Sequence, residues 1–291
     1  MNRGKKLVIV LGPTAVGKTS YAIRLAKECG SPVISCDSRQ LYKEMSIGTA
    51  VPSKEELAEV KHYFIQCRSV RDHYTAGLYE LDATALAEEL FKTHDTLVMC
   101  GGSGLYIEAF CNGLDDFPPA DPELRASLMD RLGKDGLEAL RFDLKVLDPE
   151  SYETIDIANP QRVVRALEVT IGTGRRFSSY KSGTSKERPF EIEKIGLSMP
   201  REALNSRINA RVDRMAEAGL VEEVRGLLPM KDLTALRTVG YREIFAYLDG
   251  KCTLQEALDA VKLDTRHYAK KQMTWFGRDK SIRWVTASAN G

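Results

Sequence analysis

The segment that most constrains this chain is a phosphate-binding pattern near its N-terminus. Residues Gly12 to Thr19 read Gly-Pro-Thr-Ala-Val-Gly-Lys-Thr, which satisfies G-x-x-x-x-G-K-[ST]. An apolar run, Lys6–Leu11, precedes this pattern, and helical periodicity from Lys18 to Cys29 follows it. In that setting, backbone N–H groups can wrap an anion, the lysine adds a positive charge, and the threonine hydroxyl can face Mg²⁺. The sequence therefore predicts a phosphate site between a strand and a helix.

Apolar runs alternating with helical patterns predict a parallel sheet. Between 115 and 188 the patterns are helical, which predicts an insertion. The expected fold is α/β: a P-loop NTPase-like parallel sheet flanked by helices, with an inserted α-helical lobe. The expected core domain is 1–114 with 189–291, and the expected helical insertion domain is 115–188. The predicted strands are Lys6–Leu11, Pro32–Cys36, Tyr63–Cys67, Thr96–Cys100, Pro189–Met199 and Ser281–Thr286. Predicted helices in the insertion are Pro122–Arg131, Leu137–Arg141 and Pro160–Gly172, and helical periodicity returns at 201–218 and 253–276.

Composition excludes several classes of protein. The 291 residues include 42 Lys and Arg against 41 Asp and Glu, and 43% are hydrophobic, which is unlike a disordered or fibrous chain. The apolar run Leu7 to Leu11 is far shorter than a membrane span. Six cysteines are scattered without a Cys-x-x-Cys pair, so neither a disulfide framework nor a zinc site is expected. We expect a soluble, cytoplasmic monomer without membrane association.

Charge is distributed unevenly although it nearly cancels. Residues 113–160 hold 12 acidic and 5 basic residues, whereas 161–188 and 262–283 each hold 7 basic and 2 acidic residues. Two basic segments far apart in sequence can form two sides of an anion-binding cleft, although solvated helix faces produce such runs more often. Charge alone leaves a nucleic-acid role open.

The position of acidic residues at strand ends limits the reactions that this chain could catalyse. The strand Thr96–Cys100 is followed by Gly101-Gly102 instead of the Asp that holds Mg²⁺ in many P-loop NTPases. The acidic residue at a strand end is Asp37, directly after the second predicted strand. Because ligands bind at the carboxyl ends of strands in open α/β sheets, Asp37 is expected near the phosphate-binding loop. A carboxylate there can serve as a base or help to hold a metal; the alternative is a residue that caps its own turn.

Taken together, the motifs resemble those of the tRNA dimethylallyltransferase (isopentenyltransferase) family from about residue 7 to 285. The motifs in order are Gly12-Pro-Thr-Ala-x-Gly-Lys-Thr19, Asp37-Ser-x-Gln-Leu-Tyr42, Gly48-Thr-Ala50, Gly101-Gly-Ser-Gly-Leu-Tyr106, Asp121-Pro-Glu-x-Arg125, Asn159-Pro-Gln-Arg162-Val-Val-Arg165-Ala-Leu-Glu168, Arg237-x-Val-Gly-Tyr-Arg242 and Lys271-Gln-x-Thr-Trp275-Phe. The resemblance implies transfer of a dimethylallyl group from dimethylallyl diphosphate to N6 of the adenine 3′ of the anticodon in tRNA. Diphosphate is then the leaving group.

The resemblance also implies roles for individual residues. Asp37 is the expected base, Lys18 and Arg211 the cations on the diphosphate, and Thr19 the protein ligand of the cofactor Mg²⁺. The diphosphate is expected to contact Gly12, Pro13, Thr14, Ala15, Val16, Gly17, Lys18 and Thr19. The resemblance also implies that the insertion 115–188 binds tRNA. The expected tRNA contacts are Asp37, Ser38, Arg39, Gln40, Ser103, Arg125, Gln161, Arg162, Val163, Val164, Arg165, Arg237, Gly240, Tyr241, Arg242 and Lys271.

Three positions depart from the family's pattern. Ser103 stands where threonine is usual, so the hydroxyl is kept without the stiff β-branched rotamer. His62 stands alone where two histidines are common, and we expect a structural role without a metal. Arg278 lies one residue farther from Trp275 than usual, which rotates it by about 100° on a helix. Trp275 itself is expected in the core.

Three other functions remain open at this level. A small-molecule or nucleotide kinase shares the phosphate loop, a short parallel sheet and a helical lid. An isopentenyltransferase that acts on free adenine nucleotides would share the donor site. An RNA-binding module with a vestigial phosphate loop is the non-enzymatic alternative, against which the intact Lys18, Thr19 and Asp37 argue.

Overall fold

The chain forms two compact units. The computed structural model describes residues 4–119, 121–183 and 185–287. One unit comprises Met1–Gly113 and Glu187–Gly291, and the other comprises Leu114–Lys186. These boundaries lie close to the expected ones at 114/115 and 188/189. None of the described helices combines the length and apolarity that a membrane span requires.

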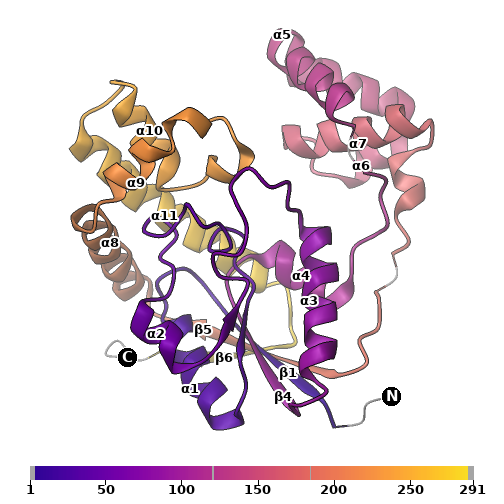
Figure 1. Cartoon of the computed structure of the whole chain (residues 1–291). Helices are drawn as coiled ribbons and strands as arrows, with labels where there is room; N and C mark the ends of the chain where they lie inside the picture. Colours follow the sequence, from indigo (N-terminus) through magenta and orange to yellow (C-terminus); the bar gives the residue numbers. More distant parts are fainter. Residues whose placement is uncertain (1–3, 120, 184, 288–291) are drawn as a thin grey trace. The chain divides into compact units, whose positions relative to one another are not determined.

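The first unit is built on a parallel sheet, as predicted (Figure 1). Its six strands run in the order β3-β2-β4-β1-β5-β6, and every neighbouring pair is parallel. The strands are β1 (Lys6–Leu11), β2 (Val33–Ser35), β3 (His62–Tyr63), β4 (Thr96–Cys100), β5 (Glu191–Ser198) and β6 (Ile282–Thr286). The phosphate loop therefore leaves a central strand.

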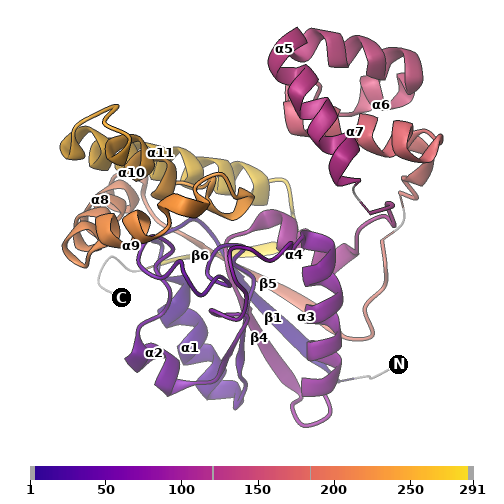
Figure 2. The same ribbon diagram turned by 45° about the horizontal axis from the view of Figure 1, so that its top comes forward.

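Helices cover both faces of this sheet because its central strand is apolar on both sides. Leu7, Ile9 and Leu11 of β1 pack in the cluster that includes side chains of α3 (Ala76–Leu90) and α4 (Gly104–Asn112). Val8 and Val10 pack in the cluster that includes α1 (Lys18–Cys29) and α8 (Arg201–Glu217). Figure 2 shows α1 and α3 on opposite sides of the sheet. The other helical segments of this unit are α2 (Lys54–Glu59), α9 (Leu220–Gly226), α10 (Tyr241–Leu248), α11 (Leu254–Phe276) and the 3₁₀ turns η2 (Leu228–Met230) and η3 (Thr234–Leu236).

The sheet order places a ligand site between β1 and β4. These strands are neighbours, but the helices that follow them, α1 and α4, pack on opposite faces. Such a reversal opens a crevice at the carboxyl ends of the strands. Backbone hydrogen bonds join the carboxyl ends of β1, β2 and β4 here. Gly101 N donates to Val10 O at 3.1 Å, and Cys36 N donates to Cys100 O at 2.8 Å. The segments after β1, β2 and β4 thus meet at one edge.

One predicted strand is largely wrong. The prediction was Tyr63–Cys67, but β3 ends at Tyr63. Phe64 and Gln66 have φ angles of 60° and 47°, in the left-handed region that an extended strand excludes. The chain turns there because Gln66 N, Cys67 N and Arg68 N donate to the carbonyls of Gln40 and Leu41. This loop therefore pairs with the segment after β2.

The second unit has its own apolar core. It comprises α5 (Pro122–Leu147), α6 (Pro149–Thr154), α7 (Pro160–Thr173) and the 3₁₀ turn η1 (Phe177–Tyr180). Helix α5 spans both segments predicted as separate helices and breaks at Gly136, whose φ is 79°. Leu128, Leu140 and Leu144 of α5 pack against buried α7 side chains. The unit is helical, as predicted.

Candidate active site

The phosphate-binding loop has the backbone of an anion nest. Gly12, Ala15 and Gly17 have positive φ angles of 141°, 64° and 101°. Such turns direct successive N–H groups into one concavity. A Cβ at Gly12 would lie 2.5 Å from the Leu197 carbonyl oxygen, so only glycine fits there. In the described part of the chain no side chain caps the N-terminus of α1, and its first turn holds no acidic residue. The positive end of this helix therefore faces the loop without a competing carboxylate.

Two cations border this nest. Lys18 Nζ donates to Pro13 O at 2.7 Å, and Arg211 Nη1, which comes from α8, donates to Thr14 Oγ1 at 3.2 Å. Burial lowers the pKa of both Lys18 and Arg211, and the Asp37 charge acts in the opposite direction on each. Backbone hydrogen bonds join the segments after β1, β2 and β4, and Arg211 reaches the loop after β1 at Thr14, so Asp37, Lys18 and Arg211 lie in one site. An anion bound in the nest would be held by partly desolvated positive charges.

Asp37 is oriented by the turn that it begins. Its Oδ1 accepts hydrogen bonds from Arg39 N at 2.8 Å and Gln40 N at 3.3 Å. Oδ2 accepts neither bond. The carboxylate therefore does cap its turn, as the alternative interpretation required, but the cap occupies only one oxygen. The second oxygen is free of this structural task.

Ser38 and Ser103, both predicted for tRNA, contact each other. Ser103 Oγ accepts from Ser38 N at 2.9 Å and donates to Ser38 Oγ at 3.1 Å. Beside them is Tyr268 of α11, which the motif analysis missed. The residue as a whole is 40% exposed, but desolvation of its phenol and the Asp37 charge raise the pKa of Tyr268 to about 12, while Arg39 and the Ser103 hydroxyl act in the opposite direction. An aromatic ring thus lies beside the candidate base.

Gln272 was not predicted as a site residue, although its neighbour Lys271 was predicted to contact tRNA. Its side chain is 6% exposed. Oε1 accepts from Thr14 N at 2.9 Å, and Nε2 donates to Gly102 O at 2.8 Å. Gln272 therefore ties the phosphate loop to the loop after β4. Its place in the Lys271-Gln-x-Thr-Trp275 motif was the available signal, but no local pattern reveals a partner 258 residues away.

Glu223 of α9 is a third missed residue. Its Oε2 accepts from Ser46 N at 2.9 Å and Ile47 N at 2.7 Å, and its Oε1 accepts from Gly48 N at 3.0 Å. The loop that it holds continues to Ala50, whose carbonyl accepts from Gln40 Nε2 at 2.8 Å. Glu223 thereby supports the turn on which Asp37 lies.

Four of the residues predicted to contact tRNA are buried. Val163 and Val164 are completely buried in the core of the second unit, because they occupy the inward face of α7. Tyr241 is also completely buried and donates to Glu223 Oε1 at 2.7 Å, and Gly240 beside it is buried. Their side chains are therefore packed inside the protein, and tRNA contact from these four residues stays a prediction.

Two arginines that were predicted to contact tRNA form ion pairs within the second unit. Arg125 Nη1 and Arg165 Nη1 lie 3.1 and 3.3 Å from Glu168 Oε2, and the Glu168 side chain is 2% exposed. Arg125 also donates to Gln161 Oε1 at 2.9 Å, and Arg165 donates to Pro118 O at 2.8 Å. A buried carboxylate without its cations is costly, so these arginines stabilise the unit. The neighbouring Arg162 is exposed.

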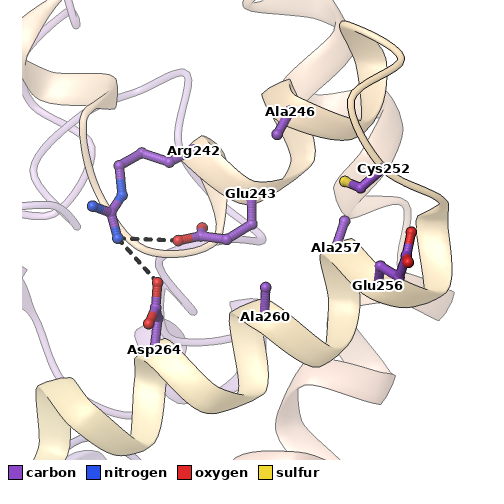
Figure 3. Close-up of a pocket in the computed structure, with 8 residues that line it drawn as sticks. All are labelled: Arg242, Glu243, Ala246, Cys252, Glu256, Ala257, Ala260 and Asp264. Atoms are coloured by element: carbon purple, nitrogen blue, oxygen red, sulfur yellow. Dashed lines mark hydrogen bonds and ion pairs between the residues drawn. The ribbon is translucent and has the colours of Figure 1, made fainter.

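The remaining predicted contacts, Arg237, Arg242 and Lys271, are exposed. Arg242 borders a cavity of about 350 Å³ between α10 and α11 and pairs there with Glu243 at 3.0 Å and Asp264 at 3.3 Å (Figure 3). The walls between these charged groups include Ala246 and Ala260. Neither the phosphate loop nor Asp37 lines this cavity, so it is separate from the candidate active site.

Trp275 and His62 are the other two residues for which the sequence predicted a structural role. Trp275 was expected in the core but is 37% exposed, so that prediction was wrong: the residue lies on an outward part of α11 with its indole against Gly104. The His62 Nδ1 lies 2.8 Å from Val60 O, in line with a structural role. Among the described residues no cluster of His, Cys, Asp and Glu could hold a metal ion.

Comparisons with known proteins identify the family of this chain. Residues 40–279 match the IPP transferase family. The tRNA dimethylallyltransferase of Christiangramia forsetii is 50% identical over 284 residues, which cover 98% of this chain and 94% of that protein. The tRNA dimethylallyltransferase 1 of Phocaeicola vulgatus is 47% identical, with coverages of 96% and 93%.

Solved structures give the same result. The tRNA isopentenylpyrophosphate transferase of Bacillus halodurans superposes with a TM-score of 0.72 at 36% identity, over 97% of this chain and 90% of that chain. A eukaryotic dimethylallyltransferase acting on tRNA has a TM-score of 0.82 at 24% identity, over 98% and 74% of the two chains, which supports the fold. Because the family match covers most of the sequence and the relatives are similar over nearly their full length, this chain belongs to the IPP transferase family.

Proposed function

We propose that this chain transfers a dimethylallyl group from dimethylallyl diphosphate to N6 of the adenine 3′ of the anticodon in tRNA. Two relatives that match nearly the whole chain carry the name of this activity. The observation that carries the proposal is the juxtaposition of the Asp37 turn, held to the loops after β1 and β4 by backbone hydrogen bonds, with an anion nest bordered by Lys18 and Arg211. A base beside a site for a phosphate leaving group is what this reaction requires.

The donor's diphosphate would occupy the nest from Gly12 to Thr19. Backbone N–H groups, Lys18 and Arg211 would stabilise the charge that develops on the departing diphosphate. Thr19, in the first turn of α1, offers a hydroxyl oxygen, a hard donor that fits Mg²⁺ together with phosphate oxygens. When bound, Mg²⁺ would neutralise part of the diphosphate charge. A dedicated cage of carboxylates is unnecessary for such a site.

Asp37 would orient the acceptor. Its carboxylate would accept a hydrogen bond from the adenine N6 and take a proton from that amino group. The N6–carbon bond then forms as the allylic carbon–oxygen bond breaks, and the diphosphate leaves with the electron pair. The adenine must first leave the stack of the anticodon loop, at a cost of roughly a few kcal/mol.

Exposed polar side chains would hold the rest of the tRNA. In the second unit these are Gln161 and Arg162, and in the first unit they are Arg237 and Lys271. Arg39 and Gln40 continue the Asp37 turn and are half-buried. The cytoplasmic location and the monomeric state stay predictions.

Mass analysis of a tRNA anticodon stem-loop tests the proposal. After incubation with dimethylallyl diphosphate and Mg²⁺, we expect a gain of one C5 unit on the base 3′ of the anticodon. Parallel incubations with ATP and a panel of acceptors test the kinase alternative, and free adenine nucleotides test the related acceptor class. Phosphoryl transfer, or prenylation of free nucleotides with an unmodified stem-loop, would replace the proposal.

Substitutions of the two α7 arginines should distinguish a role in tRNA binding from a role in the stability of the second unit. We expect Arg162→Ala to weaken stem-loop binding and to reduce the slope of log K against log salt by about 1, without a change in melting temperature. Arg165→Ala should instead lower the melting temperature, because it leaves the buried Glu168 carboxylate with one cation fewer. Salt-dependent binding and thermal unfolding of both variants check this. An unchanged salt slope for Arg162→Ala would make that arginine a solvated surface residue.

A further inference from the structure

A small pocket lies beside Thr19, at the carboxyl end of β2. Its volume is about 20 Å³, whereas one water molecule needs roughly 10–15 Å³. Its polar walls come from Thr19, Ser35, Gln40 and His62, which belong to four separate segments of the first unit. The pocket therefore has room for about one water molecule next to the threonine of the phosphate loop.

Strand pairing brings the walls of this pocket together. Val33 and Ser35 are two residues apart on β2, so they share the face of the sheet that α1 covers, where Val33 packs. On β3, His62 lies opposite Val33. On β4, Cys100 lies opposite Ser35. Thr19, in the first turn of α1, lines the pocket from the helix side.

Two of the polar walls keep hydrogen-bonding capacity that the protein does not use. Ser35 is 4% exposed, and its hydroxyl accepts a long bond of 3.4 Å from Asp37 N but donates none within the described part of the chain. Gln40 Nε2 donates to Thr49 O at 3.2 Å and to Ala50 O at 2.8 Å. Both amide hydrogens of Gln40 are thereby engaged, and its Oε1 remains an acceptor.

His62 supplies a further acceptor. Its Nδ1 lies 2.8 Å from Val60 O, and because a carbonyl only accepts, Nδ1 carries the hydrogen and Nε2 has a lone pair in the neutral ring. Burial lowers the pKa of His62, which favours that neutral ring. The described residues that line the pocket include no carboxylate, lysine or arginine. The pocket is therefore polar and uncharged, and it is rich in hydrogen-bond acceptors.

A water molecule on Mg²⁺ needs acceptors of this kind. One of its lone pairs faces the metal, so the water donates both of its hydrogens. Mg²⁺ usually keeps several waters when few protein groups and the phosphates of a substrate bind it. In many P-loop NTPases an Asp after a strand helps to hold the ion, but β4 ends at Cys100 and Gly101 follows. Orienting the hydrated ion is then left to neutral acceptors.

We propose that Ser35, Gln40 and His62 hold a water molecule of the Mg²⁺ ion that Thr19 would bind together with the diphosphate. These three residues orient the hydrated ion and do not ligate it. The inference rests on the proposed function and extends its Mg²⁺ site beyond Thr19, the protein ligand expected from the sequence. It also gives His62 a role toward the hydrated ion without a bond to the metal.

Calorimetric titration with inorganic diphosphate at several Mg²⁺ concentrations tests this inference without tRNA or a prenyl donor. Loss of a group that orients a metal site through hydrogen bonds typically costs about 10- to 100-fold in metal affinity. We expect Ser35→Ala and His62→Leu each to raise the Mg²⁺ concentration for half-maximal diphosphate binding by about 10-fold. Diphosphate affinity without Mg²⁺ should stay at the parent value, and saturating Mg²⁺ should restore binding, because the phosphate nest is intact.

Ser31→Ala is the matched control. Ser31 is also a buried serine, but it lies just before the amino end of β2 and does not line the pocket. Its hydroxyl donates to Pro32 O at 2.7 Å and accepts from Val98 N at 3.1 Å. This variant should keep the Mg²⁺ dependence of the parent, even where its melting temperature falls.

The outcomes distinguish this inference from the function on which it rests. A parent-like Mg²⁺ dependence in either folded variant, an equal shift in Ser31→Ala, or Mg²⁺-independent diphosphate binding by the parent would overturn the water site. So would a loss of affinity for dimethylallyl diphosphate without one for inorganic diphosphate, which would assign the pocket to the prenyl group. In each case a parent protein that prenylates the stem-loop leaves the proposed function intact. A parent that binds no diphosphate at any Mg²⁺ concentration would overturn the proposed donor site itself.

Discussion

Replacing Asp37 by asparagine is expected to slow single-turnover prenyl transfer by about 10²- to 10⁴-fold, the usual contribution of a general base. The asparagine side-chain oxygen can still accept the bonds from Arg39 N and Gln40 N that hold the turn. The change therefore removes the charge and the proton acceptor while it preserves the local backbone. Donor affinity should stay the same or improve, because a negative charge near the diphosphate is lost.

Single-turnover measurement with saturating tRNA and donor isolates this effect from binding. Asp72→Asn is a matched control, since Asp72 Oδ2 also accepts a backbone bond in a turn, from Ser69 N at 2.8 Å, and Asp72 is exposed. The control should transfer at the parent rate. If a folded Asp37→Asn protein also transfers at that rate, Asp37 is a capping residue and not the base.

Replacing Lys18 by methionine should produce the second large loss. We expect prenyl transfer to fall by about 10²- to 10³-fold, the usual cost of removing one group that stabilises developing negative charge. Donor binding should weaken as well, because Lys18 lies at the nest that would hold the diphosphate. Stem-loop affinity should stay near the parent value, since the change is confined to the donor end of the site.

The same variant tests the electrostatics of the free protein. Burial lowers the Lys18 pKa, which means that the folded protein disfavours the ammonium charge. Methionine keeps an apolar stem of similar length, so melting temperature should not fall. Lys54→Met, at an exposed position in α2, controls for loss of a positive charge. Equal losses of donor and stem-loop affinity in folded Lys18→Met would contradict this division of the site.

Local patterns in the sequence determined the elements that build the site. Strands β1 and β4 and helix α1 have the predicted bounds, because a buried parallel strand and an amphipathic helix each leave a periodic signal in neighbouring residues. The spacing of Gly12, Gly17 and Lys18 was enough to predict a phosphate nest, since that backbone geometry is formed within eight residues. The position of Asp37 at a strand end predicted its approach to the nest through the general topology of parallel sheets.

Tertiary structure alone decided which side chains face the site and which are buried. The Val163 and Val164 side chains share a motif with exposed Arg162 yet point into the core, and Trp275 reads as a core residue yet is exposed. Contacts between distant segments were equally unpredictable from the sequence. Gln272 accepts a hydrogen bond from Thr14 N, and Glu223 accepts one from Ser46 N. A periodic pattern reports the environment of a helix face or strand, but it carries no information about which distant segment packs there. That pairing depends on how the chain crosses the sheet, which is why Tyr268, Gln272 and Glu223 became visible as parts of the site only in the folded protein.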